Sequence, residues 1–155
     1  MMKRTTASST DVSKPYQQRR IRHGVVGVIL CEDRFLLIRR SQTVAAPGLI
    51  CFAGGGLEEG ESEQQALVRE MQEELAIDVA PGERIWECTT RWGFKLGWWL
   101  IEAPTDLCPQ PNPAEVEEIL WMTRPEISLR KDLLGSMPDF LDAWRTGLLT
   151  LPIKY

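Results

Sequence analysis

Three glutamates with helical spacing, Glu70, Glu73 and Glu74, are the residues of this chain that most clearly suggest chemistry. Positions i, i+3 and i+4 share one face of a helix. Like-charge pairs at this spacing cost a helix about 0.2–0.5 kcal/mol each, so a positive group should compensate them. Arg69 can do so in part, and a hard divalent cation such as Mg²⁺, which takes carboxylate oxygens, does so better. Taken alone, the three residues are more typical of a solvated acidic face.

The glycine-rich residues 54–62 (GGGLEEGES) precede the three glutamates. Two phosphate-binding motifs have glycines at similar spacing, but neither fits this segment. The dinucleotide pattern G-x-G-x-x-G needs a glycine where the chain has Glu59. The phosphate-loop pattern G-x-x-x-x-G-K-[ST] needs a lysine where the chain has Glu61. A carboxylate at that point opposes contact with phosphate oxygens, so direct phosphate binding by the loop is rejected.

The apolar patterns around this segment predict a sheet built from local hairpins. Residues 24–31 and 34–40 are strand-like and are joined by a turn at Glu32-Asp33. Three further runs are predicted strands, and Pro81-Gly82 is predicted to break the chain before the first of them. These runs are residues 84–91, 97–102 and 116–122.

Two helices are predicted to pack on this sheet. The first spans residues 62–75, where Ser62 and Gln65 match a capping box and apolar residues recur every four positions. The second spans residues 136–146, with Ser136 as its N-cap. Helices interspersed with local hairpins indicate an α+β fold with a mixed sheet, and not a doubly wound parallel sheet.

The segment from Gly55 to Ile77 resembles the signature box of the Nudix hydrolases: G, five residues, E, seven residues, then R-E-apolar-x-E-E-x-G-apolar. The one departure is Ala76, which replaces the late glycine. A left-handed alanine there costs roughly 1–2 kcal/mol, so we expect an effect on stability and not on chemistry. The residues that match the box are Gly55, Glu61, Arg69, Glu70, Met71, Glu73, Glu74 and Ile77.

The resemblance implies a Nudix-like α/β/α sandwich and the hydrolysis of a nucleoside diphosphate linked to another moiety, with water attacking phosphorus and Mg²⁺ or Mn²⁺ as cofactor. Arg69 would orient the glutamates, Gly55 would be structural, and Glu61 would support the loop–helix junction or a second ion. Glu73 or Glu74 would be the general base. The implied metal ligands are Glu70, Glu73, Glu74 and the carbonyl oxygen of Gly54.

A further ligand and the substrate contacts are expected outside the box. The resemblance favours Glu115 or Glu118 as the further ligand, although this acidic run also fits a charged edge strand. Arg40 resembles a basic position that contacts substrate phosphate. Trp92 and Trp98 are candidates for stacking on a base, while hairpin packing is the commoner use of such residues.

Composition limits what else the chain can do. Its 155 residues carry 22 acidic and 18 basic side chains, a net charge of −4. This balance argues against counterion-driven binding to nucleic acid, so the expected partner is a small nucleotide-type diphosphate. A protein of this charge that handles phosphates needs a cation between its carboxylates and the substrate. A homodimer is a further expectation from the resemblance.

The domain organisation is simple. Residues 1–20 are predicted to form a flexible tail, and residues 21–155 a single Nudix domain. No apolar run approaches the ~20 residues that span a bilayer, and no secretory signal is evident. The four scattered cysteines are predicted to be buried thiols in a reducing, cytoplasmic compartment.

Three rival functions remain open at this point. A non-catalytic nucleotide sensor is one, although a sensor would not need the intact acidic motif. Diphosphate isomerisation is another, with Cys51 as the nearby cysteine, but the single histidine makes its ligand set inadequate. Removal of RNA caps is the third, and the chain has no added basic domain.

Overall fold

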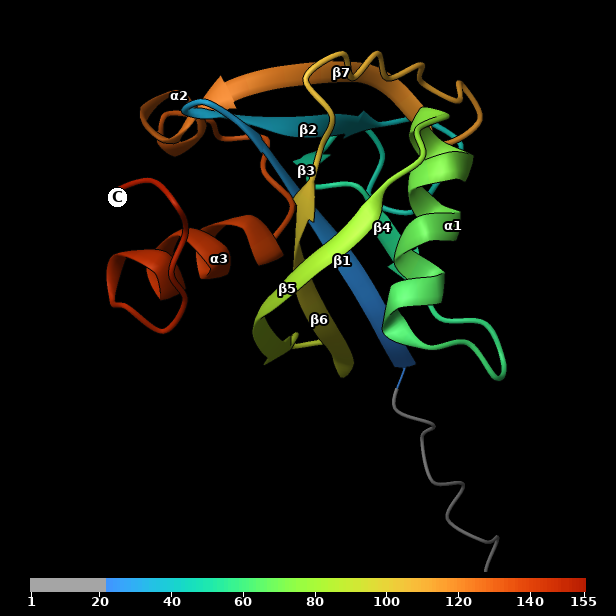
Figure 1. Cartoon of the computed structure of the whole chain (residues 1–155), viewed down its shortest axis with the longest axis horizontal. Coiled ribbons are helices and arrows are strands. Elements are labelled where there is room, and N and C mark those ends of the chain that lie inside the picture. The colour runs from blue at the N-terminus through green and yellow to red at the C-terminus, as the bar shows by residue number, and fades with distance from the viewer. Residues whose placement is uncertain (1–21) are drawn as a thin grey trace, which may run out of the picture.

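The computed structural model describes residues 22–155, so the predicted tail over residues 1–20 lies outside the described residues. A seven-stranded sheet and three helices make up the fold (Figure 1). In chain order these are β1 (Arg22–Cys31), β2 (Arg34–Arg40), β3 (Ile50–Cys51), β4 (Gly54–Gly56), α1 (Glu63–Leu75), β5 (Ala80–Thr89), β6 (Phe94–Glu102), β7 (Val116–Thr123), α2 (Arg124–Ser128) and α3 (Ser136–Arg145).

The sheet is mixed, as the sequence predicts. Its strands follow the order β3-β2-β1-β6-β5, with β4 added to β1 and β7 added to β2. The β1–β6 pair is parallel, and the other pairs, including the predicted β1–β2 hairpin, are antiparallel. In the sequence, α1 and the four strands β2 to β5 separate β1 from β6, so the connection is long enough for a parallel pair.

Along one edge, β1 pairs with two different strands, so these two strands separate from each other. Residues 24–26 pair with β4, whereas Leu30 and Cys31 pair with β2. Between them, the Gly27 N–H donates to the carbonyl oxygen of Ala53, at 2.9 Å. Strands β2 and β4 therefore leave β1 at different points, and the candidate site described below lies where they diverge.

Helices cover both faces of the sheet, which gives the expected α/β/α sandwich (Figure 1). Trp98 and Trp99 are neighbours in β6 and so point to opposite faces. Trp98 stacks on Phe140 of α3 at 5.0 Å between ring centroids, and the Trp99 indole N–H donates to Glu63 of α1 at 2.7 Å. Both rings are buried, because a helix covers each face of the sheet at this point.

Helix α1 forms for the local reasons visible in the sequence. Ser62 is its N-cap, and the predicted capping box with Gln65 is present in both directions. Its apolar stripe is fully buried against the sheet. The helix ends at Ala76, which has φ 52° and ψ 39°, the left-handed conformation in which glycine is favoured.

Several sequence predictions of element boundaries are wrong. Pro81-Gly82 does not break the chain but lies inside β5, an edge strand where proline is tolerated and where the pairing register shifts. Ser136 is the first residue of α3 and not its cap, because Gly135 occupies the cap position without a side-chain bond. The short helix α2 was not predicted; Thr123 and Glu126 form its capping box.

The cysteines only partly match the prediction of buried thiols. Cys51 is buried and Cys88 half-buried, whereas Cys31 and Cys108 are exposed and contradict it. All four are free thiols. Among residues 22–155, no helix has the length and apolar character needed to cross a membrane.

The left-handed Ala76 yields a prediction about stability. Replacing Ala76 with Gly should raise the free energy of unfolding by about 1 kcal/mol, because glycine adopts this conformation without a Cβ clash. Urea denaturation of the two proteins measures the difference. The matched control is Ala66→Gly inside α1, which should destabilise the protein instead. A lower stability for Ala76→Gly would contradict the assignment of strain to this residue.

Candidate functional site

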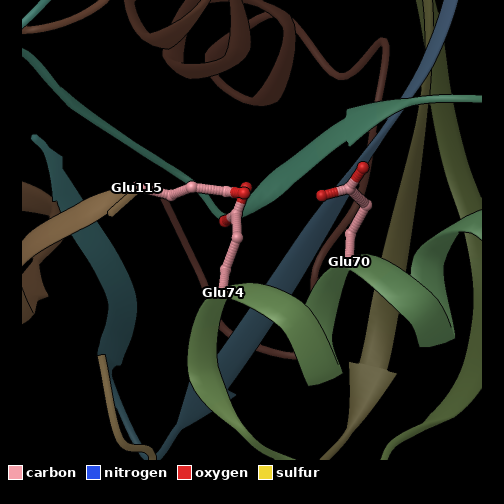
Figure 2. Close-up of side chains that lie close together, drawn as sticks. All are labelled: Glu70, Glu74 and Glu115. Atoms are coloured by element: carbon pink, nitrogen blue, oxygen red, sulfur yellow. The ribbon is translucent and has the colours of Figure 1, made fainter. Parts of the chain in front are cut away.

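Three carboxylates from two separate parts of the chain converge beside α1. Glu70 and Glu74 project from α1, and Glu115 comes from the turn that precedes β7 (Figure 2). One oxygen from each lies within 4.8 Å of the others. Glu70 and Glu74 are 7% and 5% exposed, so two of the three acids are removed from water.

Burial and mutual repulsion make this cluster unfavourable when it is fully ionised. Burial raises the pKa of Glu74 to about 8, with a further contribution from the charge of Glu70 and an opposing hydrogen bond from the Gly54 N–H. Burial also raises the pKa of Glu70, against the effect of Arg69. Carboxylate oxygens at this separation are the donor set that Mg²⁺ and Mn²⁺ take. The residues present therefore fit a divalent cation.

Arg69 connects the remaining acids of the box. Its guanidinium donates to both oxygens of Glu61, at 2.7 and 2.9 Å, and to Glu70 at 2.9 Å and Glu73 at 3.1 Å. This pairing and the Glu58 N–H lower the pKa of Glu61 to about 2. Glu61 thus braces the loop before α1. Glu73 is half exposed and lies outside the three-carboxylate cluster.

The glycines of the box are explained by close approach. A Cβ atom on Gly55 would lie 2.2 Å from Oε1 of Glu70, so any side chain there would displace the carboxylate. A Cβ atom on Gly54 would lie 2.1 Å from the carbonyl oxygen of Val25. The Gly54 N–H lies 3.4 Å from Oε2 of Glu74. Strand β4 therefore forms a wall of backbone against which the buried acids rest.

The structure separates the two candidates for the further ligand. Glu115 joins the cluster. Glu118 does not, because its carboxylate accepts a hydrogen bond from Arg39 at 3.0 Å on the other face of β2. Arg39 also donates to Asp132, at 3.0 Å. Alternation along the strand accounts for the difference, since Arg40 faces the site while Arg39 faces away from it.

An apolar cavity of about 520 Å³ adjoins the carboxylates. A smaller hollow of about 250 Å³ holds the acids, and both are lined by Arg40, Gly54 and Gly55. Arg40 therefore lies at the junction, where its Nε donates to the Ala45 carbonyl oxygen at 2.7 Å. The apolar side chains of the larger cavity include Val26, Phe52, Phe94, Leu96, Trp98 and Leu134.

The two tryptophans named as substrate contacts occupy different environments. Trp92 is 59% exposed, borders the cavity, and carries the guanidinium of Arg91 4.2 Å from its ring centroid. Trp98 is fully buried, and its indole N–H donates to Cys88 Sγ at 3.3 Å. Trp98 therefore contributes to the cavity as part of a packed wall, whereas Trp92 is free to contact a ligand.

Some parts of the site have no signal in the sequence. Ala45 and Ala46 line the cavity from one loop. Leu134, in the loop before α3, and Ser136, the first residue of α3, line it from a segment about ninety residues later. Cys51 also lines it, but burial raises the pKa of this thiol to about 11, so it is held neutral. This environment gives no support to an isomerase that needs a reactive cysteine.

The family model of the NUDIX domain matches residues 21–144 of this sequence. The chain belongs to the Nudix family. Its Nudix fold is also that of the MutT protein from Methanosarcina mazei, with a TM-score of 0.71, 22% identity, and coverage of 82% of this chain and 94% of that one.

Two curated Nudix relatives extend the comparison. The CTP pyrophosphohydrolase of Escherichia coli is 43% identical over 61 residues, which are 39% of this chain and 45% of that protein. The NAD-capped RNA hydrolase NudC of Stutzerimonas stutzeri is 30% identical over 127 residues, which are 77% of this chain and 44% of that protein. The chain thus spans about half the length of the curated relatives it matches.

The raised pKa of Glu74 yields a pH prediction for the metal-free Nudix domain. The folded pKa of about 8 exceeds the ordinary value of 4.5, so the folded state retains a proton that the unfolded state loses. Stability should therefore fall as the pH rises from about 4.5 to about 8. The lowered pKa values of Glu61 and Glu63 act below this window, where their stabilisation is lost as the pH falls.

Urea denaturation in a chelator at about pH 5 and about pH 9 measures this effect. Glu74→Gln should lose most of the difference between the two pH values. Glu83→Gln removes an exposed glutamate on β5 and should keep it. Equal pH dependence in the wild type and in Glu74→Gln would contradict the assignment.

Proposed function

We propose that this Nudix protein is a divalent-metal-dependent hydrolase of diphosphate bonds in a small nucleotide-type substrate. The observation that carries the proposal is the convergence of Glu70, Glu74 and Glu115 within 4.8 Å, next to a cavity large enough for a nucleoside. The names of the relatives support the same class of reaction, since they are a CTP pyrophosphohydrolase and an NAD-capped RNA hydrolase.

The geometry suggests how the substrate is divided between the two hollows. Its phosphates would lie at the carboxylates, and the remainder of the molecule would enter the apolar cavity. Arg40 borders both spaces, so its guanidinium is suited to a phosphate oxygen at the junction. The sparse polar lining of the larger cavity favours an aromatic or apolar group over a second charged one.

The proposed metal ligands are Glu70, Glu74 and Glu115, with the Gly54 carbonyl oxygen as a further candidate. When bound, Mg²⁺ or Mn²⁺ supplies positive charge at the phosphate oxygens and the leaving group. Arg69 orients Glu70 and Glu73 through the ion pairs described above. Water attacks phosphorus, a carboxylate takes a proton from that water, and the bond from phosphorus to the bridging oxygen breaks.

We assign the general base to Glu73. It lies in the smaller hollow with the other acids but outside their cluster, so its carboxylate remains available for a proton. Glu74 is the alternative base, but its buried position within the cluster suits a metal ligand better. Arg69, 3.1 Å from Glu73, keeps this side chain over the site.

Two glutamine variants separate these roles. Glu73→Gln should lower kcat by at least about 100-fold at saturating Mg²⁺, because proton transfer contributes this much. Glu74→Gln should instead raise the Mg²⁺ concentration needed for half-maximal activity. Glu59→Gln, an exposed acid of the same loop, is the control and should resemble the wild type. The assay uses nucleoside triphosphates, nucleotide sugars, dinucleoside polyphosphates and coenzyme diphosphates. Full activity of Glu73→Gln would refute its role.

The cavity yields a separate prediction about substrate binding. Trp92→Ala should raise KM by roughly fivefold or more with little change in kcat, because a stacked base loses about 1–3 kcal/mol of binding. Trp92→Phe should retain most of the affinity, since it keeps an aromatic face. Leu148→Ala, which removes another exposed apolar side chain away from the cavity, is the control. An unchanged KM in Trp92→Ala would exclude the stacking role.

We further propose that residues 21–155 act as one Nudix domain, which the family match over residues 21–144 supports. The expected homodimer and the expected cytoplasmic location stay predictions from the sequence.

A further inference from the structure

The loop before β7 bonds directly to the C-terminal end of α1. The last four carbonyl groups of a helix lack partners within the helix. Here the Gln110 N–H donates to the carbonyl oxygen of Leu75 at 2.7 Å, and the Asn112 N–H donates to that of Glu74 at 2.9 Å. The loop thus caps α1 at the turn that carries one of the buried carboxylates.

Asn112 also shapes the turn that carries the third carboxylate. Its side-chain oxygen accepts from the Ala114 N–H at 3.2 Å, which is an Asx turn. Its carbonyl oxygen accepts from the N–H groups of Glu115, at 3.0 Å, and Val116, at 2.7 Å. The backbone of this one residue therefore bonds to Glu74 on one side and to Glu115 on the other.

The sequence around Asn112 fits this task. It is the only asparagine of the chain and lies between Pro111 and Pro113. A residue that precedes proline is restricted to extended conformations, and proline itself has a fixed φ. The loop is thus held close to its bound shape before it docks on α1, which lowers the entropy lost on docking.

A second set of bonds holds the other side of the turn. The Ser41 N–H donates to the Glu115 carbonyl oxygen at 3.0 Å, and its hydroxyl donates to the Ala114 carbonyl oxygen at 2.9 Å. Ser41 follows β2, so these bonds tie Glu115 to the sheet. The bonds of Asn112 tie it to α1, and both are needed to define where Glu115 lies relative to Glu74.

We propose that Asn112 is a positioning residue for the carboxylate cluster, which holds Glu115 within reach of Glu70 and Glu74. The inference rests on the proposed metal-dependent function, since it assumes that the cluster binds a cation. Asn112 would touch neither substrate nor metal. Its effect would be to keep the third carboxylate in place, so that little free energy is spent on ordering it when the cation binds.

The test measures Mn²⁺ affinity directly, by calorimetry or by the paramagnetic resonance signal of free Mn²⁺, without substrate. Asn112→Ala removes the Asx bond and should weaken Mn²⁺ binding roughly three- to tenfold, as expected for one hydrogen bond. Asn112→Ser retains a weaker acceptor and should bind with intermediate affinity. Gln110→Ala is the matched control, because it removes an exposed amide of the same loop and should leave Mn²⁺ affinity unchanged.

A double-mutant cycle shows whether Asn112 acts through Glu115. Glu115→Gln should weaken Mn²⁺ binding, and adding Asn112→Ala to it should weaken binding no further. Fully additive losses, or wild-type affinity in Asn112→Ala, would overturn the positioning role. So would an unchanged affinity in Glu115→Gln.

The proposed function fails in a different way. In that case the wild-type protein would bind no Mn²⁺ and hydrolyse none of the diphosphates. If the wild type binds Mn²⁺ and Glu74→Gln does not, while Asn112→Ala equals the wild type, the metal site stands and the positioning role is refuted. Thermal denaturation of Asn112→Ala and Asn112→Ser identifies any loss of affinity that arises from unfolding.

Discussion

Two glutamates buried side by side on α1 impose the constraint on which the rest of this structure depends. Glu70 and Glu74 lie one turn apart and are almost fully removed from water. A buried carboxylate is unfavourable unless it is paired, hydrogen-bonded or protonated. Three features reduce the cost of burying these carboxylates. Arg69 pairs with Glu70, the Gly54 N–H approaches Glu74, and the pKa of Glu74 rises to about 8. These features leave part of the negative charge of the cluster uncompensated. Such a cluster of carboxylates favours the binding of a divalent cation.

The pairing of β1 with two different strands along one edge leaves the carboxylate cluster accessible to a ligand. Because β1 pairs with β4 at one end and with β2 at the other, the two strands diverge over the buried acids. Their divergence leaves room for the apolar cavity, and Arg40 at the end of β2 lies at the junction of cavity and carboxylates. Had β2 paired with β1 along its whole length, the space taken by β4 and its glycines would be closed. The same topological feature thus provides the backbone wall for Glu70 and the path for a ligand.

The sequence predicts the parts of the site that are local and misses those that depend on long-range packing. Glu70, Glu73 and Glu74 could be placed on one face of a helix because helical periodicity alone fixes their relation. The choice between Glu115 and Glu118 could not be made, since it depends on the register of β7 against β2. The cavity could not be predicted from the sequence either, because loops distant in the chain contribute Ala46 and Leu134. Trp99 shows the same limit: a strand pattern cannot tell whether a helix covers its second face.

The C-terminal end of α1 combines a strained residue, buried packing and a carboxylate of the candidate site. Ala76 takes a left-handed conformation that is unfavourable for a residue with a Cβ atom. It persists because its N–H and that of Ile77 bond back to Gln72 and Met71, and because Ile77 is buried. The docking of Asn112 on the Glu74 carbonyl oxygen adds a further restraint from outside the helix. These contacts oppose fraying of the helix end, and fraying here would move Glu74 out of the cluster. Ala76 therefore keeps its strained conformation directly after the turn of α1 that carries Glu74.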